Sequence, residues 1–587
     1  MTADSMETYK NTPPKVDAEV KTKKRFWRDG ALILALILGP ILLLGLYSHR
    51  MVAGLVSPDA MDFAQLGRNL LNGHGFSTQI LRPLALTHGN NPLSQPELTH
   101  GPLYPFVLAL AFGVLGIKDS VVLGISGLFF VLSVPLLYLL GERLFHRRIG
   151  ILAALIFMAD GTVLGYAASG SATMFYTFIG LGLFLSLHEV AIAAAKGKQK
   201  RGGLLLSGIL CGLLYLSDPI FLCVFPVVLL GLALMYPKQW ALAIATFAVP
   251  FGVLVLPTMI RNGMLSGNPF LGLRGSELWM GTASLPRMEG YRLTPTDLPT
   301  GPEMFLGVGR KIFLNMAALV NLLQQLPASW ILLAAIPGLF YRYNQSGVQR
   351  VRQLVIGSLL SVLGGTVLLH LNPTLLMIAV PALLVFALGY LLHIAAQAQL
   401  AQSARTFAGI LVGCALLLPL LGDVVSVRVP ASVPEAATAR WLGQTANVGD
   451  VCISDQPWIV AWYADRPAVW TPRQDIQITE VRKQFAGVRW LFLTAQVQQL
   501  SPEWNMIFRD MMQWNMTFVQ AAQNQTSSPP PLRISGAGRP DVHLLRALDG
   551  FASAPPPESK MPTAMVAELE VADLRAAAPV SSRLPDR

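Results

Sequence analysis

The chain has 587 residues, of which 53% are hydrophobic and only 13% charged, whereas about 25% of the residues of a soluble domain are charged. This composition excludes an ordinary soluble globule and indicates a protein that lies mostly in a membrane. The formal net charge of +11 does not indicate a nucleic-acid partner, because the Lys and Arg residues cluster in short segments between apolar runs, as they do when they set membrane topology.

Apolar runs follow one another through residues 31–425. The basic segment 1–30 precedes a first run that has no signal-peptide cleavage pattern, and each helical span needs about 20 residues. The Lys and Arg residues between the runs place the N-terminus in the cytoplasm if the short run 103–117 lies at the outer interface instead of crossing. The sequence thus predicts an α-helical polytopic protein of the plasma (inner) membrane with about eleven transmembrane helices. The predicted spans are 31–48, 119–140, 149–168, 174–194, 203–217, 220–236, 239–258, 327–341, 353–370, 374–393 and 406–424.

Three long segments then lie on the extracytoplasmic side, and their polar, Gly, Pro and aromatic content is typical of loops that build a site. They are the outer loops 49–118 and 259–326 and the C-terminal part of the chain. Within residues 426–550, strand-like runs such as Val451–Ser454 alternate with helix-like stretches, which predicts a soluble α/β domain. Residues 551–587 are rich in Ala, Pro and Ser and predict a flexible tail.

The first outer loop carries an ordered series of acidic, Gly-rich and Pro-rich segments. A carboxylate at the membrane edge is suited to accept the proton of an acceptor hydroxyl or to hold a divalent ion, so Asp59 is the candidate catalytic residue. The alternative is that Asp59 caps the helix that follows, a role compatible with catalysis.

Asp62 is a candidate for pairing, for instance with Arg68, and for the substrate site. Glu97 and His100 are acid–base or metal-ligand candidates, with loop structure as the simpler explanation. The segments read Ser57-Pro58-Asp59-Ala60-Met61-Asp62, Gly73-His74-Gly75, Glu97-Leu98-Thr99-His100 and Gly101-Pro102-Leu103-Tyr104-Pro105.

With these segments the sequence resembles the glycosyltransferase C superfamily, in particular its family 39 type, which includes protein O-mannosyltransferases and lipid A aminoarabinose transferases. That family has an acidic residue, often Asp-Glu, in its first outer loop, followed by a helix and a Pro-Pro-Leu-Tyr segment; here Asp59 and Gly101–Pro105 stand at these positions. Ile260–Gly263 and Gly267–Pro269 resemble the pieces that open the family's large loop after the seventh span. The resemblance implies a membrane glycosyltransferase that moves a hexose or pentose from a polyprenyl-phosphate donor to a lipid, glycan or protein acceptor, with Tyr104 among the substrate contacts.

The sequence departs from this family at the second acidic position. Ala60 replaces the usual Glu, and the short outer loop 166–174, where the family commonly has another acid, contains no carboxylate. Asp160, in the outer half of the third apolar run, is a candidate replacement, because an ionisable group at membrane depth is costly and often functional. A structural Asp that hydrogen-bonds neighbouring helices is an equal alternative. A divalent metal ion at Asp59 is therefore an open cofactor hypothesis.

Basic and aromatic residues of the outer segments are candidates for the remaining contacts. Arg261, at the outer end of the seventh span, is the leading contact for the carrier phosphate and Arg274 the next, because a guanidinium fork matches phosphate oxygens. For Arg274, snorkelling to lipid headgroups is the favoured explanation. Trp279, Trp330, Trp458 and Trp470 are candidates for stacking on sugar rings, although an interfacial aromatic belt is the more common role of such residues. Asp218 is a further polar group on the outer side, although turn chemistry before a proline explains it more simply.

Three other functions compete with glycosyl transfer. A transporter or flippase for a lipid-linked sugar would need ionisable residues deep in several spans and two matching halves, whereas Asp160 is nearly alone in the spans and the halves do not match. A non-catalytic membrane scaffold with an outer binding domain, and a polymer ligase that acts on lipid-linked sugars, are compatible with the same topology.

Overall fold

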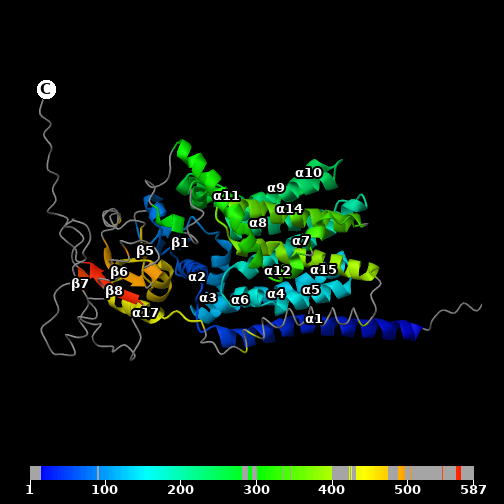
Figure 1. Cartoon of the computed structure of the whole chain (residues 1–587), viewed down its shortest axis with the longest axis horizontal. Helices are drawn as coiled ribbons and strands as arrows, with labels where there is room; N and C mark the ends of the chain where they lie inside the picture. Colours follow the sequence, from blue (N-terminus) through cyan, green and yellow to red (C-terminus); the bar gives the residue numbers. More distant parts are fainter. Residues whose placement is uncertain are drawn as a thin grey trace, which may run out of the picture.

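The structure of the chain, a computed structural model, has a large helical body and a smaller α/β part beyond one end of it (Figure 1). It describes residues 15–88, 91–280, 289–293, 301–333, 335–343, 345–398, 431–472 and 487–494, the segments 545–546 and 564–569, and a few isolated residues between them. The helices are α1 (Lys15–Met51), α2 (Pro58–Leu71), α3 (Leu103–Leu115), α4 (Asp119–Leu144), α5 (Arg147–Ala159), α6 (Gly161–Ala167), α7 (Thr173–Ala195), α8 (Arg201–Ser217), α9 (Val224–Met235), α10 (Trp240–Ser266), α11 (Pro302–Gln324), α12 (Ser329–Leu332), α13 (Ala335–Phe340), α14 (Ser346–Leu368), α15 (Val380–Gln397), α17 (Ala436–Thr445) and α18 (Pro457–Ile459), with the 3₁₀ helices η2 (Pro219–Cys223), η3 (Gly272–Leu278) and η6 (Pro373–Ile378). The strands are β1 (Ser77–Thr78), β2 (Ile80–Leu81), β3 (Gln95–Pro96), β4 (Val451–Ser454), β5 (Ala468–Trp470), β6 (Val488–Thr494), β7 (Leu545–Arg546) and β8 (Ala564–Leu569).

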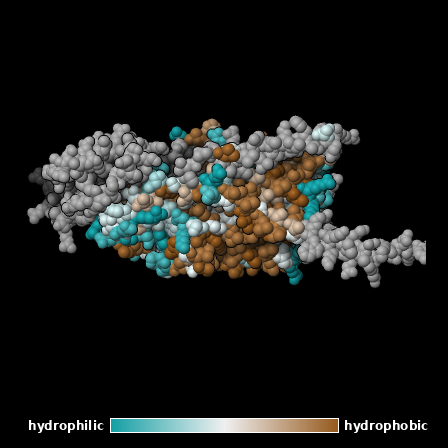
Figure 2. Space-filling view, turned by 90° about the horizontal axis from the view of Figure 1, so that it is seen from below, coloured by the Kyte–Doolittle hydropathy of each residue, from teal (hydrophilic) through white to brown (hydrophobic). Residues whose placement is uncertain are grey.

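The helical body has the composition of a membrane domain. In the described part of the chain, six helices are long and apolar enough to cross a membrane, namely the segment Gly30–Met51 of α1 together with α4, α7, α10, α14 and α15. The pair α5 and α6, bent by 67°, is a seventh candidate, and α3, α8 and Pro219–Met235 are shorter apolar segments. Hydrophobic residues form a broad band over this body, with hydrophilic residues towards its two ends (Figure 2). The prediction of an α-helical polytopic membrane protein is confirmed.

The predicted spans and the helices differ at two places. The run 327–341 forms the two short helices α12 and α13, and neither is long enough to cross a membrane. A proline is best tolerated in the first turn of a helix, so Pro337 favours a new helix start here instead of one continuous span. The predicted span 406–424 lies outside the described residues, apart from isolated positions.

The short apolar run 103–117, which we expected to lie at the outer interface, forms helix α3. It packs along α2, and its other face exposes Phe106, Leu110 and Val114, as expected of a helix that lies against lipid. The segment before α3 passes close to the end of α8, because a Cβ added to Gly101 would lie 2.2 Å from the Leu216 carbonyl oxygen. Only glycine allows this approach, which brings the first outer loop onto the ends of the spans.

The α/β part is built on a six-stranded sheet with the strand order β2-β5-β4-β6-β8-β7. Strands β2, β5, β4 and β6 are parallel, and β8 and β7 extend the sheet in antiparallel pairing. The predicted presence of an α/β region is confirmed, but two strands lie outside the limits 426–550. β2 belongs to the first outer loop, and β8 lies in the stretch that we expected to be a flexible tail. Both pair with strands distant in sequence, so local composition did not reveal them.

Candidate active site

Asp59 lies in the first turn of α2. Ser57 is the N-cap residue, and its Oγ accepts a hydrogen bond from the Ala60 N–H at 3.4 Å, so the capping role that we considered for Asp59 belongs to Ser57. The Asp59 carboxylate is half-buried and has no hydrogen bond or ion pair with any described residue. Asp59 therefore presents free carboxylate oxygens.

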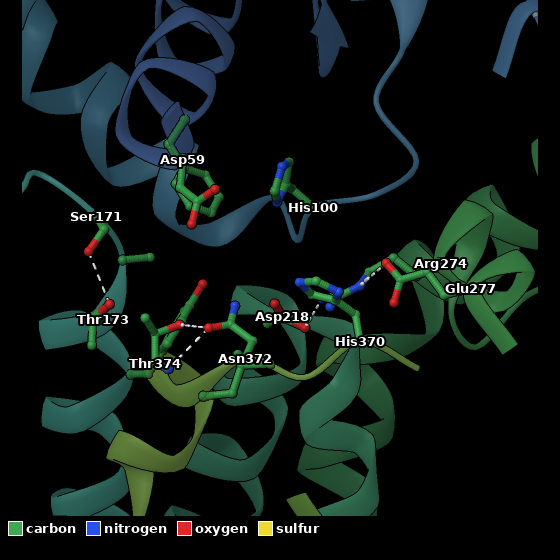
Figure 3. Close-up of a pocket in the computed structure, with 14 residues that line it drawn as sticks. Asp59, His100, Ser171, Thr173, Asp218, Arg274, Glu277, His370, Asn372 and Thr374 are labelled. Atoms are coloured by element: carbon green, nitrogen blue, oxygen red, sulfur yellow. Dashed lines mark hydrogen bonds and ion pairs between the residues drawn. The ribbon is translucent and has the colours of Figure 1, made fainter. Parts of the chain in front are cut away.

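Asp59 lines a pocket between α2 and the helical body, which we call the polar pocket. Asp59 and His100 lie on one side of it, and Asp218, His370 and Asn372 lie on the other (Figure 3). Because most of the lining side chains are polar or charged, the pocket suits a polar ligand. Its lining residues are Asp59, Phe63, His100, Ser171, Ala172, Thr173, Tyr176, Asp218, Arg274, Glu277, His370, Asn372, Thr374 and Leu375.

Arg274, on η3, is held in the wall of the polar pocket by two carboxylates. Its Nη1 donates to Asp218 Oδ1 at 2.5 Å, and its Nε donates to Glu277 Oε1 at 3.3 Å. Burial lowers the pKa of Arg274, but these carboxylates outweigh burial and raise the pKa, so the guanidinium is charged. Its Nη2 has no partner among the described residues. Arg274 therefore has donors left for a ligand.

Arg261, the leading phosphate contact in the sequence analysis, lies outside this pocket. Its Nη1 donates to the backbone carbonyl of Glu97 at 2.9 Å, and its Nη2 donates to that of Phe76 at 3.1 Å. Its guanidinium also lies 5.2 Å from the centre of the Phe76 ring. These contacts fasten the first outer loop to the end of α10, so the structure gives Arg261 a positioning role and does not bring it to Asp59.

Asp62, Glu97 and His100 meet in a buried ion-pair network that is centred on Arg82. Arg82 Nη2 lies 2.6 Å from Asp62 Oδ2, and Arg82 Nη1 lies 3.0 Å from Glu97 Oε2. His100 Nε2 lies 3.1 Å from the same Asp62 oxygen. Burial raises the pKa of Asp62, but the positive charges of Arg82 and His100 lower it to about 2. Burial lowers the pKa of His100, but Asp62 and Glu97 raise it. With His100 protonated, two positive and two negative groups balance.

The residues around Asp59 do not fit a divalent metal ion. In the described ranges, no group of three or more His, Cys, Asp or Glu side chains is arranged to hold one. Asp62 and Glu97 share one arginine, and Asp218 is bonded to another, so the charges of these carboxylates are already compensated. Among these carboxylates Asp59 has no arginine partner, whereas a bound divalent ion takes several oxygen or nitrogen ligands. No step derived below passes through a metal.

Two other predicted site residues support the frame of the site and line neither of its pockets. Asp160 lies at the bend between α5 and α6, where its Oδ1 accepts from the Thr162 N–H at 2.9 Å and its Oδ2 from the Ala328 N–H at 2.8 Å. It caps α6 and ties a distant segment to it, which supports the structural alternative. Tyr104 is fully buried, and its hydroxyl donates to the Gly170 carbonyl at 2.9 Å. Tyr104 therefore holds together two loops that border the polar pocket.

Sequence reasoning missed or undervalued three charged residues. Asp218 was explained by turn chemistry, but it also pairs with a pocket arginine, a contact that no local pattern reveals. Arg82 belongs to no motif, and its partners lie 15 and 20 residues away along the chain. Arg68, expected to pair within its own helix, instead lies 2.8 Å from Asp465 of the α/β part. Each of these pairs depends on tertiary structure.

Asp59 also lines a second pocket, which we call the aromatic pocket. Here the rings of Trp458 and Trp470 lie with centroids 5.5 Å apart and planes at 84°. Two of the four tryptophans considered for sugar stacking, Trp458 and Trp470, thus line a pocket with Asp59, whereas Trp279 and Trp330 do not line it. The pocket is lined by Pro58, Asp59, Asp62, Ile80, Arg82, Trp458 and Trp470.

The sequence matches no protein-family model and no curated protein, but the structure is similar to solved structures. The oligosaccharyltransferase of Archaeoglobus fulgidus, in complex with Zn and sulfate, matches with a TM-score of 0.54 at 13% identity, over 79% of this chain and 68% of that chain. ArnT from Cupriavidus metallidurans, bound to undecaprenyl phosphate, matches with a TM-score of 0.52 at 12% identity, over 92% and 98%. The archaeal oligosaccharyltransferase AglB from Archaeoglobus fulgidus, in complex with an inhibitory peptide and a dolichol-phosphate, matches with a TM-score of 0.51 at 13% identity, over 83% and 73%. The chain therefore shares the overall fold of these solved structures.

Proposed function

We propose that the protein is an integral membrane glycosyltransferase that moves a sugar from a polyprenyl-phosphate carrier to an acceptor on the extracytoplasmic face of the plasma membrane. The observation that carries the proposal is the presence in one pocket of a free carboxylate, Asp59, and a charged guanidinium with free donors, Arg274. The fold supports it, since structural relatives are described with dolichol-phosphate and undecaprenyl phosphate.

In the proposed reaction, Asp59 accepts the proton of the acceptor hydroxyl while the acceptor oxygen bonds to the anomeric carbon of the donor sugar. The bond between that carbon and the phosphate oxygen breaks, and its electron pair leaves with the carrier as polyprenyl phosphate. Arg274 and the protonated His100 compensate the negative charge on the departing phosphate. The proton on Asp59 is then lost to solvent, which restores the carboxylate.

The lipid tail of the carrier has a candidate surface on α11. Phe305 and Phe313 of this helix are largely exposed, as expected of side chains that meet lipid. Lys311, on the same helix, donates through Nζ to the Glu277 carbonyl at 2.6 Å, which fastens α11 to η3. Because η3 also carries Arg274, a phosphate at this guanidinium and a tail along α11 would belong to one ligand.

We also propose the following organisation of the chain. Residues 1–30 are cytoplasmic, residues 31–425 form the transmembrane domain, and residues 426–550 form the extracytoplasmic α/β domain, to which β2 and β8 contribute strands. The rest of 551–587 is the tail. The distribution of Lys and Arg between the apolar runs supports this orientation.

The test is the transfer of labelled sugar from polyprenyl-phosphate donors by the purified full-length protein in proteoliposomes, with lipid, glycan and peptide acceptors. We expect Asp59→Asn to lower transfer about 100-fold or more, because an amide cannot accept the proton. Glu435→Gln makes the same carboxyl-to-amide change where the side chain forms no capping bond, and it should leave transfer unchanged. Full transfer by Asp59→Asn would remove Asp59 from the mechanism. Movement of intact donor across the bilayer without its consumption would favour a transporter.

A further inference from the structure

The aromatic pocket lies at the carboxyl ends of parallel strands. β2, β5 and β4 run parallel, so their carboxyl ends share one edge of the sheet. Arg82 follows β2, Trp470 ends β5, and Trp458 follows β4 on α18, and all three line the pocket. Open parallel α/β sheets bind their ligands beyond this edge. The α/β part therefore places a binding pocket where this architecture favours one, and that pocket reaches Asp59.

The two tryptophans give this pocket a corner of aromatic surface with hydrogen-bond donors. Their ring planes are nearly perpendicular, at 84°, so a ligand that stacks on one ring meets the other ring from the side. In the part of the chain that the structure describes, neither indole N–H has a hydrogen-bond partner. An aromatic face with a polar donor at its edge suits an amphipathic ligand. A pyranose or furanose ring is such a ligand, because its C–H groups form apolar patches and its hydroxyls accept hydrogen bonds.

The charges of the pocket favour a neutral ligand. The positive charge of Arg82 is compensated by Asp62 and Glu97, and the whole buried network is balanced when His100 is protonated. The lining holds no cation besides this compensated Arg82, so the aromatic pocket, unlike the polar pocket with its Arg274, has no guanidinium left to attract a phosphate or an acidic peptide. The pocket is lined by residues of α2, of the sheet and of the segments that follow its strands, and by none of the long apolar helices.

Asp59 lines both pockets and is the residue that their linings share. A donor bound through its phosphate at Arg274 would thus leave the aromatic pocket free for a second substrate. We infer that the acceptor is a carbohydrate, whose terminal sugar ring binds between Trp458 and Trp470 and directs one hydroxyl to Asp59. This inference rests on the proposed function and names the acceptor class of that same site.

The experiment measures sugar binding and sugar transfer separately, with the full-length protein in nanodiscs. The probes are methyl glycosides and short oligosaccharides of glucose, galactose, mannose and N-acetylglucosamine, and binding is measured by saturation-transfer NMR without donor. We expect at least one probe to bind, and Trp458→Ala to weaken its binding about tenfold. Trp458→Phe, which keeps an aromatic face, should restore part of the affinity. Trp240→Ala is the matched control, because Trp240 is an exposed tryptophan at the start of α10, far along the chain from this pocket.

The transfer measurement distinguishes a substrate contact from a structural role. Trp458→Ala should raise the KM for the sugar acceptor by the same factor and leave the KM for the polyprenyl-phosphate donor unchanged. Absence of binding by every probe, equal binding by wild type and Trp458→Ala, or transfer to a peptide or lipid that is insensitive to Trp458 would each overturn the inference. If a probe binds and Trp458→Ala weakens it, but no donor is consumed, the proposed function fails while the sugar site stands.

Discussion

Arg82 Nη2 lies 2.6 Å from Asp62 Oδ2. Asp62 is one helical turn after Asp59 in α2, and Arg82 directly follows β2, so this ion pair joins the sheet to the helix that carries Asp59. The same Asp62 oxygen lies 3.1 Å from His100 Nε2. His100 lines the polar pocket, whereas Arg82 lines the aromatic pocket. One buried network thus fixes a wall of each pocket relative to Asp59. The positions of the two proposed substrates therefore depend on charges that need not contact either substrate.

This network predicts a large loss of stability on removal of Arg82. Arg82→Met would leave the buried carboxylates of Asp62 and Glu97 without their shared partner, and we expect a loss of about 3–5 kcal/mol. The measurement is the midpoint of thermal or denaturant unfolding in mild detergent. Arg143→Met is the control, because Arg143 pairs with Glu189 at an exposed position, where an ion pair contributes at most about 1 kcal/mol. Equal shifts in both variants would contradict the structural importance of the network.

The network also predicts how stability depends on pH. The pKa of His100 is raised above 6.5 by Asp62 and Glu97, so its contribution is fully present below pH 6.5 and is lost as the pH rises through the raised value. Asp62, with its pKa lowered to about 2, contributes above pH 3.8 and loses its contribution only as the pH falls towards 2. The stability difference between wild type and His100→Gln should therefore shrink as the pH rises from neutral to alkaline. A difference that grows with pH would refute the assignment of a protonated His100.

Much of the architecture was predictable, because a membrane span is a local property of the sequence. The position of Asp59 at the start of a helix after the first span was predictable for a similar reason, whereas its catalytic role stays a prediction. The sheet was only partly predictable, because β2 has two residues and pairs with a strand almost 400 residues later. The choice between Arg261 and Arg274 depended on how the chain turns after α10, where η3 directs the second arginine into the pocket. Such turns depend on contacts that a single sequence does not display.

Arg261 and Arg274 should differ in their effects on the donor. Arg274→Lys removes the guanidinium that has free donors in the polar pocket, so we expect the KM for the polyprenyl-phosphate donor to rise about 10- to 100-fold, the range of a hydrogen bond to a charged group. Arg261→Lys keeps a cation but weakens the two bonds to backbone carbonyls, so it should lower stability and leave the donor KM nearly unchanged. The measurement is the donor KM of wild type and of each variant, taken from steady-state rates over a series of donor concentrations. The reverse order of the two KM values would return the phosphate contact to Arg261.

Removal of divalent ions is expected to leave the reaction intact. The carboxylates nearest to Asp59 are each bonded to an arginine, and an additional cation would have to displace these buried contacts at a cost of several kcal/mol. Transfer should therefore persist after dialysis against a strong chelator, with its rate unchanged by later addition of Mg²⁺, Mn²⁺ or Zn²⁺. Loss of transfer on chelation and its recovery with one of these ions would show that Asp59 binds a metal, and it would require Asp62 or Asp218 to exchange its arginine for that ion. Asp218→Asn then distinguishes these two metal ligands. If Asp218 binds the ion, the variant should not recover activity with the metal. If Asp62 binds it, the variant should recover activity and only hold Arg274 more weakly.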